Sequence, residues 1–448
     1  MTDKFSILQS AEGRKLRISG SLPTGFHGDA EGDGFICPLD TQNAAAIRRE
    51  LPWSAPVQVG MRKSIGCGDR LGIATPGHLR AVRDGDMFPV LAQQSIREMQ
   101  RARRSAQQVL DDAMWGVIQS NYQDGWACDA DHLKTPEDID ACAAAGYVGY
   151  TLDPGQFVDD DANEAGEDSL KSKVNALPWN DLKSNAEQHQ DYYVTQLGWN
   201  TVDYLRSAAK YGAVAARVAV LDAHIRKAMG GTPYDLEVSV DETATVTTPI
   251  EHRFIALELK RLEIPFIGLA PRFVGDFEKG VDYIGDLKKF ELDYTEHAAI
   301  ARELGPYKLS IHSGSDKFSV YPIIARLSGS YVHLKTAGTS WVEALRVIAA
   351  RNPALFREIL ELAERGYDQN RASYHVSGQV ERIPNKSNAE LADLLDQFDA
   401  REVVHVSFGP VLAEFYDPIY ATLNANIEAY WNTLRHHFDK HIQPFKGH

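Results

Sequence analysis

Short strand-like segments alternate with longer helical segments along most of this chain, and that alternation restricts the fold more than any other feature. Patterns of apolar residues predict strands at 63–69, 125–131, 147–153, 235–241, 266–270, 307–312, 331–335 and 403–407. Helical patterns lie between them, for example at 96–119, 192–229 and 248–263. Eight strands that are each followed by helix predict an α/β protein with a (β/α)8 barrel of the TIM type.

The segment 235–243 indicates what such a barrel has to bury. Leu236 and Val238 alternate with Glu237 and Ser239, and this period of two predicts a strand. Helical segments precede and follow it, and a strand between helices is normally buried on both faces. A buried carboxylate has to be paired, hydrogen-bonded or bound to a metal, because an isolated buried charge is very unfavourable. The polar face of this strand therefore indicates a functional site.

Composition limits the compartment and the partners. The chain has 448 residues, 44% hydrophobic and 24% charged, which is typical of one large or two smaller soluble domains. Its net charge of −15 argues against nucleic-acid and membrane partners. The four cysteines lack CxxC spacing, so we expect reduced thiols in a cytoplasmic protein. We expect neither a signal peptide nor a membrane span, and the sequence leaves a homo-oligomer open.

Two parts of the chain depart from the strand–helix alternation. Residues 1–60 are rich in Gly, Pro and Asp, which predicts an N-terminal extension or cap. Residues 61–448 then make up the barrel. An acidic, turn-rich insertion near 155–190 interrupts it, and its most acidic part, 159–168, predicts a solvated loop or a lid.

Polar residues gather at the carboxyl ends of the expected strands, where barrels of this type carry their active sites. Alternation turns Ser310 and His312 toward the barrel axis, and it does the same for two further pairs, His333 with Lys335 and His405 with Ser407. The other strand ends supply Asp69, Arg70, Asp129, Asp131, His132, Asp153, Glu237, Asp241, Glu242 and Arg272. One polar strand end has no special meaning, but six or more on one axis indicate a site.

Carboxylates and imidazoles together suit a divalent transition metal such as Mn, Co, Ni or Zn. A catalytic metal needs three or four protein ligands and an open position. We expect Glu237 (or Asp241), His312 and His333 as the ligands, with Asp131 and His132 as the next candidates. For each residue alone, a hydrogen-bonded place in the core is the alternative.

The inward and strand-end cations have two interpretations each. Lys335 lies among acids, where it either pairs with them structurally or acts as an acid/base or carboxylate-binding group. Arg70 and Arg272 either clamp an anionic substrate group or form structural ion pairs. No GxGxxG follows a strand, and neither a phosphate-binding GxxxxGK[ST] loop nor a GxSxG nucleophile elbow occurs, so nucleotide and serine-hydrolase functions have no support.

Four motifs carry a resemblance to a known family. The stretches GDRLGIATPGH (68–78), DADHLKTPEDID (129–140), EVSVDET (237–243) and IHSGSDKF (311–318) resemble the tagaturonate epimerase family, from about residue 60 to the C-terminus. The resemblance implies a metal-dependent isomerase that interconverts D-tagaturonate and D-fructuronate or acts on a related ketose. The implied partner is a small sugar acid or ketose.

The implied reaction places demands on the site. The inverted carbon is β to the ketone, so enolisation does not acidify its C–H bond. One route is retro-aldol cleavage and re-addition, with a metal as Lewis acid. We expect Asp131 and Asp153 as the acid/base pair and Arg70, Arg272 or Lys335 as the carboxylate binder. We also expect His132, Asp241 and His405 to contact the substrate.

Two other functions stay open. Transient oxidation at the reacting carbon is a rival mechanism, although no nicotinamide fingerprint supports it. A metal-dependent aldose–ketose isomerase or an aldolase fits the same barrel, since fold alone does not decide activity. A sugar-acid binding protein without catalysis is the third alternative.

Overall fold

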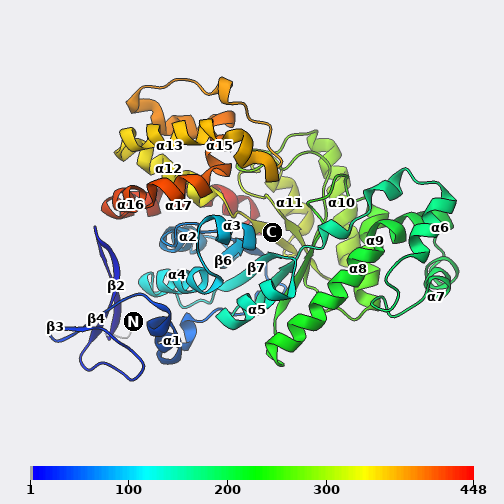
Figure 1. The fold of residues 1–448 in the computed structure, drawn as a ribbon, viewed down its shortest axis with the longest axis horizontal. Coiled ribbons are helices and arrows are strands. Elements are labelled where there is room, and N and C mark those ends of the chain that lie inside the picture. Colours follow the sequence, from blue (N-terminus) through cyan, green and yellow to red (C-terminus); the bar gives the residue numbers. More distant parts are fainter. Residues whose placement is uncertain (1–3) are drawn as a thin grey trace.

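The computed structural model describes residues 4–448, and its centre is a closed barrel of eight parallel strands (Figure 1). The strands are hydrogen-bonded in the order β10-β11-β12-β5-β6-β7-β8-β9. Their bounds are β5 (Ser64–Gly66), β6 (Phe88–Ser95), β7 (Ala127–Leu133), β8 (Gly149–Leu152), β9 (Asp235–Ser239), β10 (Gly268–Ala270), β11 (Lys308–Ile311) and β12 (Val332–Lys335). The predicted (β/α)8 barrel is therefore confirmed.

One of the eight predicted strands is wrong, and one real strand was missed. Residues 403–407 are not a strand, because they lie at the end of helix α15 (Phe398–Val406). The missing strand is β6, which pairs with β5 on one side and β7 on the other. Its sequence FPVLAQQS is almost wholly buried and so does not alternate, and Pro89 is unusual in a central strand.

Helices surround the barrel and connect its strands. Those that follow β5 to β9 are α2 (Thr75–Val82), α3 (Ile96–Arg101), α4 (Ala106–Gln119), α5 (Pro136–Ala145), α8 (Thr201–Met229) and α9 (Pro249–Arg261). Those that follow β10 to β12 are α10 (Leu287–Leu304), α11 (Tyr321–Ser328) and α12 (Thr339–Arg351). Helix α5 begins as predicted, with Thr135 as N-cap, Pro136 in the first turn and Asp138 completing a capping box.

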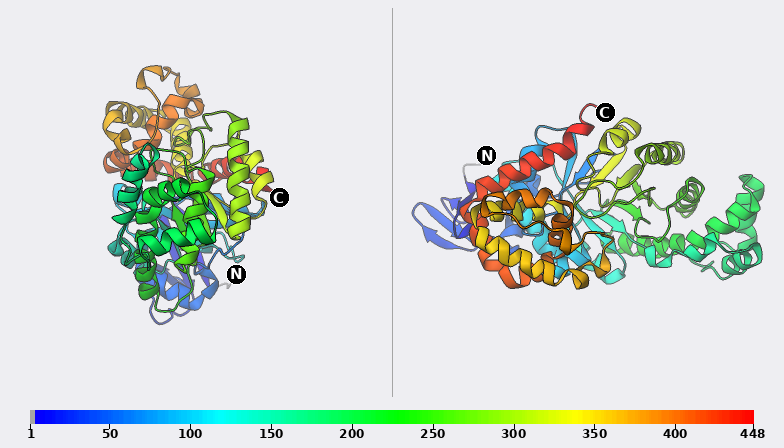
Figure 2. Two further views of the ribbon diagram at one scale, coloured as in Figure 1. Left: turned by 90° about the vertical axis from the view of Figure 1, so that its right-hand side faces the viewer. Right: turned by 90° about the horizontal axis from the view of Figure 1, so that it is seen from above.

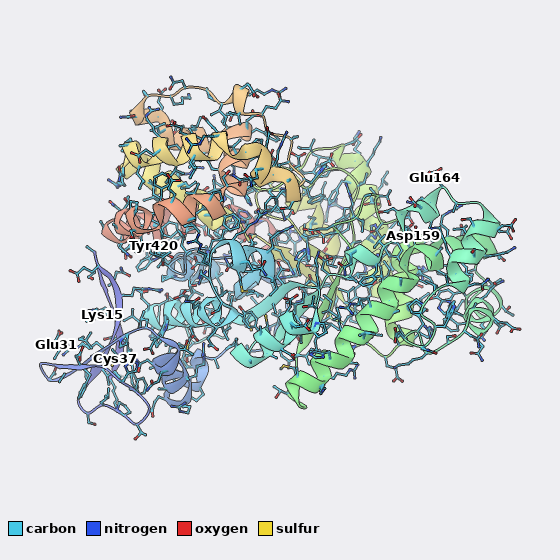
Figure 3. The ribbon with its side chains drawn as sticks, in the orientation of Figure 1. Lys15, Glu31, Cys37, Asp159, Glu164 and Tyr420 are labelled. Atoms are coloured by element: carbon cyan, nitrogen blue, oxygen red, sulfur yellow. The ribbon has the colours of Figure 1, made fainter. Side chains whose placement is uncertain are left out.

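The N-terminal part forms a small antiparallel sheet beside the barrel. Its strands are β1 (Phe5–Ser10), β2 (Gly13–Ser19), β3 (Asp29–Glu31) and β4 (Gly34–Cys37), followed by helix α1 (Thr41–Glu50). Figure 3 labels Lys15, Glu31 and Cys37 in this sheet. The sheet and α1 pack against α4 and against helix α16 (Phe408–Ala425). The expected cap of residues 1–60 covers this region, except that its first three residues lie outside the described part, and the boundary at 60 stays a prediction.

The acidic insertion builds a lobe at the far end of the molecule from the N-terminal sheet (Figure 2). It contains helices α6 (Glu167–Asn175) and α7 (Ala186–Gln190), and Figure 3 places Asp159 and Glu164 in it. Glu258 of α9 holds the lobe to the barrel. It contacts His189 Nε2 at 2.9 Å, accepts from the Tyr193 hydroxyl at 2.9 Å, and pairs with Arg261 at 2.7 Å.

The C-terminal third forms a group of helices on the side of the barrel away from the lobe, at the upper left of Figure 1. They are α12, α13 (Pro353–Arg365), α14 (Tyr367–Asn370), α15, α16 and α17 (Ile427–Ile442). Helix α17 packs against α2, so the end of the chain closes over its first βα unit. Within residues 4–448, no helix combines the length and apolar character that a membrane crossing needs.

Glu258 offers a test of how the lobe is held. Glu258→Ala leaves His189, Tyr193 and Arg261 without their shared acceptor, so it should lower the free energy of unfolding by about 3 kcal/mol, the usual cost of breaking a buried pair. Urea unfolding measures this. The matched control is Glu303→Ala, which removes an exposed carboxylate paired with Arg253 and should change stability little. Equal losses in the two variants would contradict the anchoring role.

Candidate active site

Lys335 at the end of β12 lies at the centre of the barrel's buried charges. Its ammonium is 2.6 Å from Asp131 Oδ1, 2.8 Å from Asp129 Oδ2 and 3.0 Å from Glu237 Oε1. It also donates to the Thr151 hydroxyl at 2.7 Å. Burial alone would lower the pKa of Lys335, but the three carboxylates raise it well above its ordinary value. The predicted inward orientation of Lys335 is therefore what brings β7, β8 and β9 to one cation.

His312, just beyond the end of β11, joins the barrel interior to the loop that follows β9. Its Nε2 is 2.6 Å from Glu237 Oε1, and its Nδ1 is 3.0 Å from Asp241 Oδ1. Burial would raise the pKa of Asp241, but His312 and His132 hold it well below its ordinary range. The imidazole thus has a carboxylate at each nitrogen.

His132 approaches the same place from β7. Its ring centroid is 4.9 Å from that of His312, and its Nε2 is 3.9 Å from Asp241 Oδ1. Burial would lower the pKa of His132, but Asp131, 2.9 Å from its Nδ1, together with Glu242 and Asp241, raises that pKa to about 10. His132 has a φ of 55°, a left-handed backbone conformation that non-glycine residues adopt mainly where the surroundings impose it.

Ligand atoms of His132, Asp241 and His312 all lie within 4.8 Å of one another. Two imidazoles and a carboxylate are a donor set that suits a divalent transition metal, and three protein ligands leave positions for substrate. The structure thus joins His312 to Asp241, which the sequence named as the alternative to Glu237. It adds His132, a second-choice ligand in the sequence analysis.

His333 lies in a different layer of the barrel. Its Nδ1 is 2.9 Å from the Ser64 hydroxyl, and that hydroxyl accepts from Lys308 at 3.2 Å. Burial lowers the pKa of His333 to about 3. His333 belongs to none of the metal-donor groups found among residues 4–448, so the structure does not assemble the expected set of Glu237, His312 and His333.

A second donor group, Asp316, His437 and His441, lies under helix α17. Its donors already have partners. Asp316 Oδ1 is 2.6 Å from His437 Nε2 and 3.0 Å from Arg401 Nη2, and the Asp316 amide donates to His441 Nε2 at 2.9 Å. Because Arg401 neutralises the carboxylate, we interpret this group as a structural ion-pair network that holds α17 in place.

Two adjoining cavities open beside the His132–Asp241–His312 group. The larger, of about 330 Å³, is lined by Asp241, Glu242, Thr243, Pro271, Arg272, Phe273, Gly275, Asp276, Phe277, Lys279, His312, Ser313, Ser373, Tyr374 and His375. The smaller, of about 40 Å³, has among its lining residues Arg70, Gln93, Asp131, His132, Lys335 and His405. Lys279, His312, Ser313 and Tyr374 line both. No residue of the acidic insertion lines either cavity, so the predicted lid does not cover them in this structure.

The expected substrate-binding residues fall into different situations. Arg70 is buried and donates to Glu98 at 2.5 and 3.1 Å and to the His405 carbonyl at 3.1 Å. Its guanidinium also stacks on Phe408 at 3.8 Å. The contacts of Arg70 therefore favour a structural ion pair. Arg272 lines the larger cavity, where it could contact an anionic group of a substrate.

His405 lines the smaller cavity for a reason the sequence did not indicate. It was expected on an inward strand, whereas it lies in α15 and points between two loops. A Cβ at Gly338 would overlap its ring, and one at Gly280 would come within 2.7 Å of Nδ1. Glycine at these two positions gives the imidazole its space. Burial, with the cations Arg70 and Lys279, keeps the pKa of His405 well below its ordinary value.

Asp153 lines neither the larger cavity nor the smaller one, which Asp131 lines. Its carboxylate pairs with Lys134 at 3.0 Å and accepts from the Gly155 amide at 3.0 Å. It lines a separate opening with His132 and Glu242. Ligand atoms of Asp153, His132 and Glu242 lie within 4.8 Å of one another, and Asp131 is 2.9 Å from His132 Nδ1, so His132 lies near both expected acid/base residues.

A segment of the C-terminal third, the strap Ser373–Gly378, lies over the cavities. Tyr374 lines both, and its ring is stacked on by Arg97 at 4.9 Å and Arg101 at 5.0 Å. Arg97 also donates to the Ser373 carbonyl at 3.2 Å and to Glu242 at 3.2 Å. No sequence pattern pointed to this segment, because nothing local distinguishes a loop that covers a site.

The other end of the strap is held by two carboxyl groups. The Ser377 amide donates to Glu278 at 3.1 Å and to Glu402 at 3.0 Å, and the Gly378 amide donates to Glu402 at 2.6 Å. Burial and the adjacent Glu278 raise the pKa of Glu402 to about 8. Glu402 is therefore protonated at neutral pH, which removes its charge repulsion with Glu278.

Comparisons with known proteins agree over the whole chain. A sequence model described as tagaturonate epimerase matches residues 3–445. A tagaturonate/fructuronate epimerase of Thermotoga maritima is 38% identical over 463 aligned residues, covering 99% of this chain and 94% of that protein. The native crystal structure of a fructuronate-tagaturonate epimerase from Cohnella laeviribosi superimposes with a TM-score of 0.92 at 34% identity, covering 98% of this chain and 93% of that one. A glycerol complex of the Cohnella protein gives a TM-score of 0.91.

The raised pKa of Glu402 predicts a pH dependence of stability. The pKa of Glu402 is about 8 in the fold against an ordinary value of 4.5, so the folded state holds a proton that the unfolded chain has lost in this interval. The free energy of unfolding should therefore fall as pH rises toward about 8 and then level off. Glu402→Gln keeps a neutral partner for Glu278 and should remove this slope.

Thermal unfolding from about pH 6 to about pH 8 tests this, because the wild-type midpoint should fall more steeply than that of Glu402→Gln. The exposed Glu414→Gln on α16 serves as control and should follow the wild type. Parallel curves for wild type and Glu402→Gln would contradict the raised pKa of Glu402.

Proposed function

Because this chain belongs to the tagaturonate epimerase family, whose members are isomerases, we propose that it interconverts D-tagaturonate and D-fructuronate. The observation that carries the proposal is the group of His132, Asp241 and His312 beside the Lys335–Asp131 pair, at the mouth of a cavity. This lies at the carboxyl ends of barrel strands, where such enzymes bind their substrates. The larger cavity, of about 330 Å³, is in the size range of a small-molecule site.

A divalent metal held by His132, Asp241 and His312 fits this site. The donor types suit Mn, Co, Ni or Zn, and the three ligand atoms already lie within 4.8 Å of one another. Glu237, 2.6 Å from His312 Nε2, would orient that imidazole, as carboxylates commonly do behind metal-bound histidines. When bound, the ion supplies Lewis-acid stabilisation of negative charge on the substrate's oxygens.

The protein's own groups supply the proton transfers. In retro-aldol chemistry, a base takes the proton of the hydroxyl on the inverted carbon, and the bond from that carbon to the α-carbon breaks. The aldehyde then turns over, and the bond re-forms on its other face. Asp131 is the proposed base. Its pKa is held well below the ordinary range, against the effect of burial, by His132 and Lys335, so it is ionised at neutral pH.

Lys335 and Asp153, the other expected catalytic residues, have different geometric support. Lys335 lines the smaller cavity with Asp131 and keeps its positive charge there, so we propose that it stabilises the ionised Asp131 and the developing negative charge on substrate. Asp153 lines a separate opening, which it shares with His132. We therefore propose that Asp153 exchanges protons with the substrate by way of the His132 imidazole, which also lines the smaller cavity.

The activity itself is tested by a time course of NMR spectra with D-tagaturonate. The protein is stripped with chelator and resupplied separately with Mn, Co, Ni and Zn. We expect D-fructuronate to accumulate only when a metal is restored. An aldose product would indicate an isomerase and two fragments an aldolase. Binding without turnover under any metal would leave the non-catalytic alternative.

Two variants separate the ligand set in the structure from the one expected from sequence. His132→Ala should lose bound metal and activity, because it removes one of the three clustered donors. His333→Asn should keep its metal, because His333 bonds Ser64 in another layer. Metal content is measured by elemental analysis of the purified proteins. Retained metal in His132→Ala together with loss in His333→Asn would favour the set Glu237, His312 and His333.

A further inference from the structure

Lys279 is a cation at the junction of the two cavities. It lies in the loop between β10 and α10, is half-buried, and lines both cavities. Its ammonium donates to the Ser313 hydroxyl at 2.6 Å. Among residues 4–448, no carboxylate oxygen lies within 4.0 Å of it, so its charge has no direct ion-pair partner in the described part of the chain.

Most other cations around the cavities already have partners. Arg272 is the exception, since no carboxylate oxygen among residues 4–448 lies within 4.0 Å of it, but it lines only the larger cavity. Lys335 pairs with three carboxylates, Arg70 with Glu98, and Arg97 with Glu242. Lys317, which lies behind Lys279, donates to three backbone carbonyls. Lys279 has only a hydroxyl as partner, and two of its three ammonium hydrogens stay free for a ligand.

Ser313 makes this a two-donor site. It follows His312 directly, and its φ of 48° is a left-handed conformation that fixes the hydroxyl beside the Lys279 ammonium. Since the Ser313 oxygen accepts from Lys279, its own hydrogen is free to be donated. A carboxylate oxygen placed here would receive one hydrogen bond from an ammonium and one from a hydroxyl, a charge-assisted arrangement.

The charges around the larger cavity explain why such a group is needed. Asp241, Glu242 and Asp276 line it, and they would repel a sugar acid. We propose that Lys279, together with Ser313, binds the carboxylate of the substrate and sets the preference for a sugar acid over a neutral ketose. This inference rests on the proposed function for the identity of the sugar acid. A carboxylate bound by Lys279 and Ser313 would lie close to His312, because Ser313 is the next residue in the chain. The rest of the substrate's carbon chain would then extend toward Asp131.

Lys279→Met tests the proposal because it keeps the chain length and removes the charge. Its kcat/KM for D-tagaturonate should fall about 100-fold, mostly through KM, since a charge-assisted hydrogen bond is worth about 1.5–3 kcal/mol. Its kcat/KM for the neutral ketose with CH2OH in place of the carboxylate should change little. Lys279→Arg should recover part of the activity on D-tagaturonate. Lys289→Met, on the exposed face of α10, should match the wild type with both substrates.

Binding is measured separately so that a failure of the proposed function is recognisable. D-galactonate, a sugar acid without a ketone, is titrated by calorimetry into the metal-loaded wild type, Lys279→Met and Lys289→Met. We expect weaker binding only in Lys279→Met. Equal binding in all three, or equal loss on acidic and neutral substrates, overturns the role of Lys279. Arg272→Met is titrated in the same way, and a selective loss of sugar-acid binding in that variant but not in Lys279→Met also overturns the role of Lys279. A wild type that binds galactonate without converting D-tagaturonate contradicts the proposed function alone.

Discussion

The contact of Lys335 with Asp129, Asp131 and Glu237 is the constraint on which the barrel interior depends. Three carboxylates from β7 and β9 lie within 3.0 Å of one ammonium. Burying these carboxylates without a cation would be very unfavourable, and so would burying the ammonium without the carboxylates. Because the four groups come from three strands, the cation meets the carboxylates only when the barrel is closed. The same balance keeps Asp131 and Glu237 ionised, which is the state that proton transfer and imidazole orientation both require.

The barrel interior divides into layers with different chemistry. In the layer of His333, Ser64 and Lys308, hydrogen bonds at Ser64 join β5 to β12 and, past it, to β11. Burial lowers the pKa of both His333 and Lys308. At the carboxyl ends of the strands, His312 and His132 lie beside the carboxylate of Asp241. This layer therefore pairs imidazoles with a carboxylate, whereas the other layer pairs an imidazole with a hydroxyl and a lysine. An imidazole can lose its proton and bind a metal ion through the freed lone pair, whereas a lysine ammonium has no lone pair to offer a metal. The layer that can take up a cation is thus the one next to the cavities.

Segments far apart in the sequence complete the cavities. Lys279, Ser313 and Tyr374 come from three loops and His405 from α15, and all four line the smaller cavity. Arg97 and Arg101 stack on Tyr374 at one end of the strap. At the other end, Glu278 and Glu402 accept hydrogen bonds from its backbone amides. The strap is therefore held by two stacked guanidinium groups at one end and by a protonated Glu402 beside Glu278 at the other. The acidic insertion, anchored by Glu258, lies away from the cavities.

The sequence alone determined the barrel class, the inward orientation of His312 and Lys335, and the start of α5, because strand alternation and helix caps are local geometry. It did not find β6, whose fully buried residues do not alternate, and it placed residues 403–407 in a strand although a helix accommodates the same short apolar pattern. It named Asp241 as an alternative ligand beside His312 and His132 as a next candidate, but it did not put these three residues in one set, and it gave no sign of Lys279 or the strap. Those depend on distances between segments up to hundreds of residues apart, and only barrel closure and loop packing set such distances.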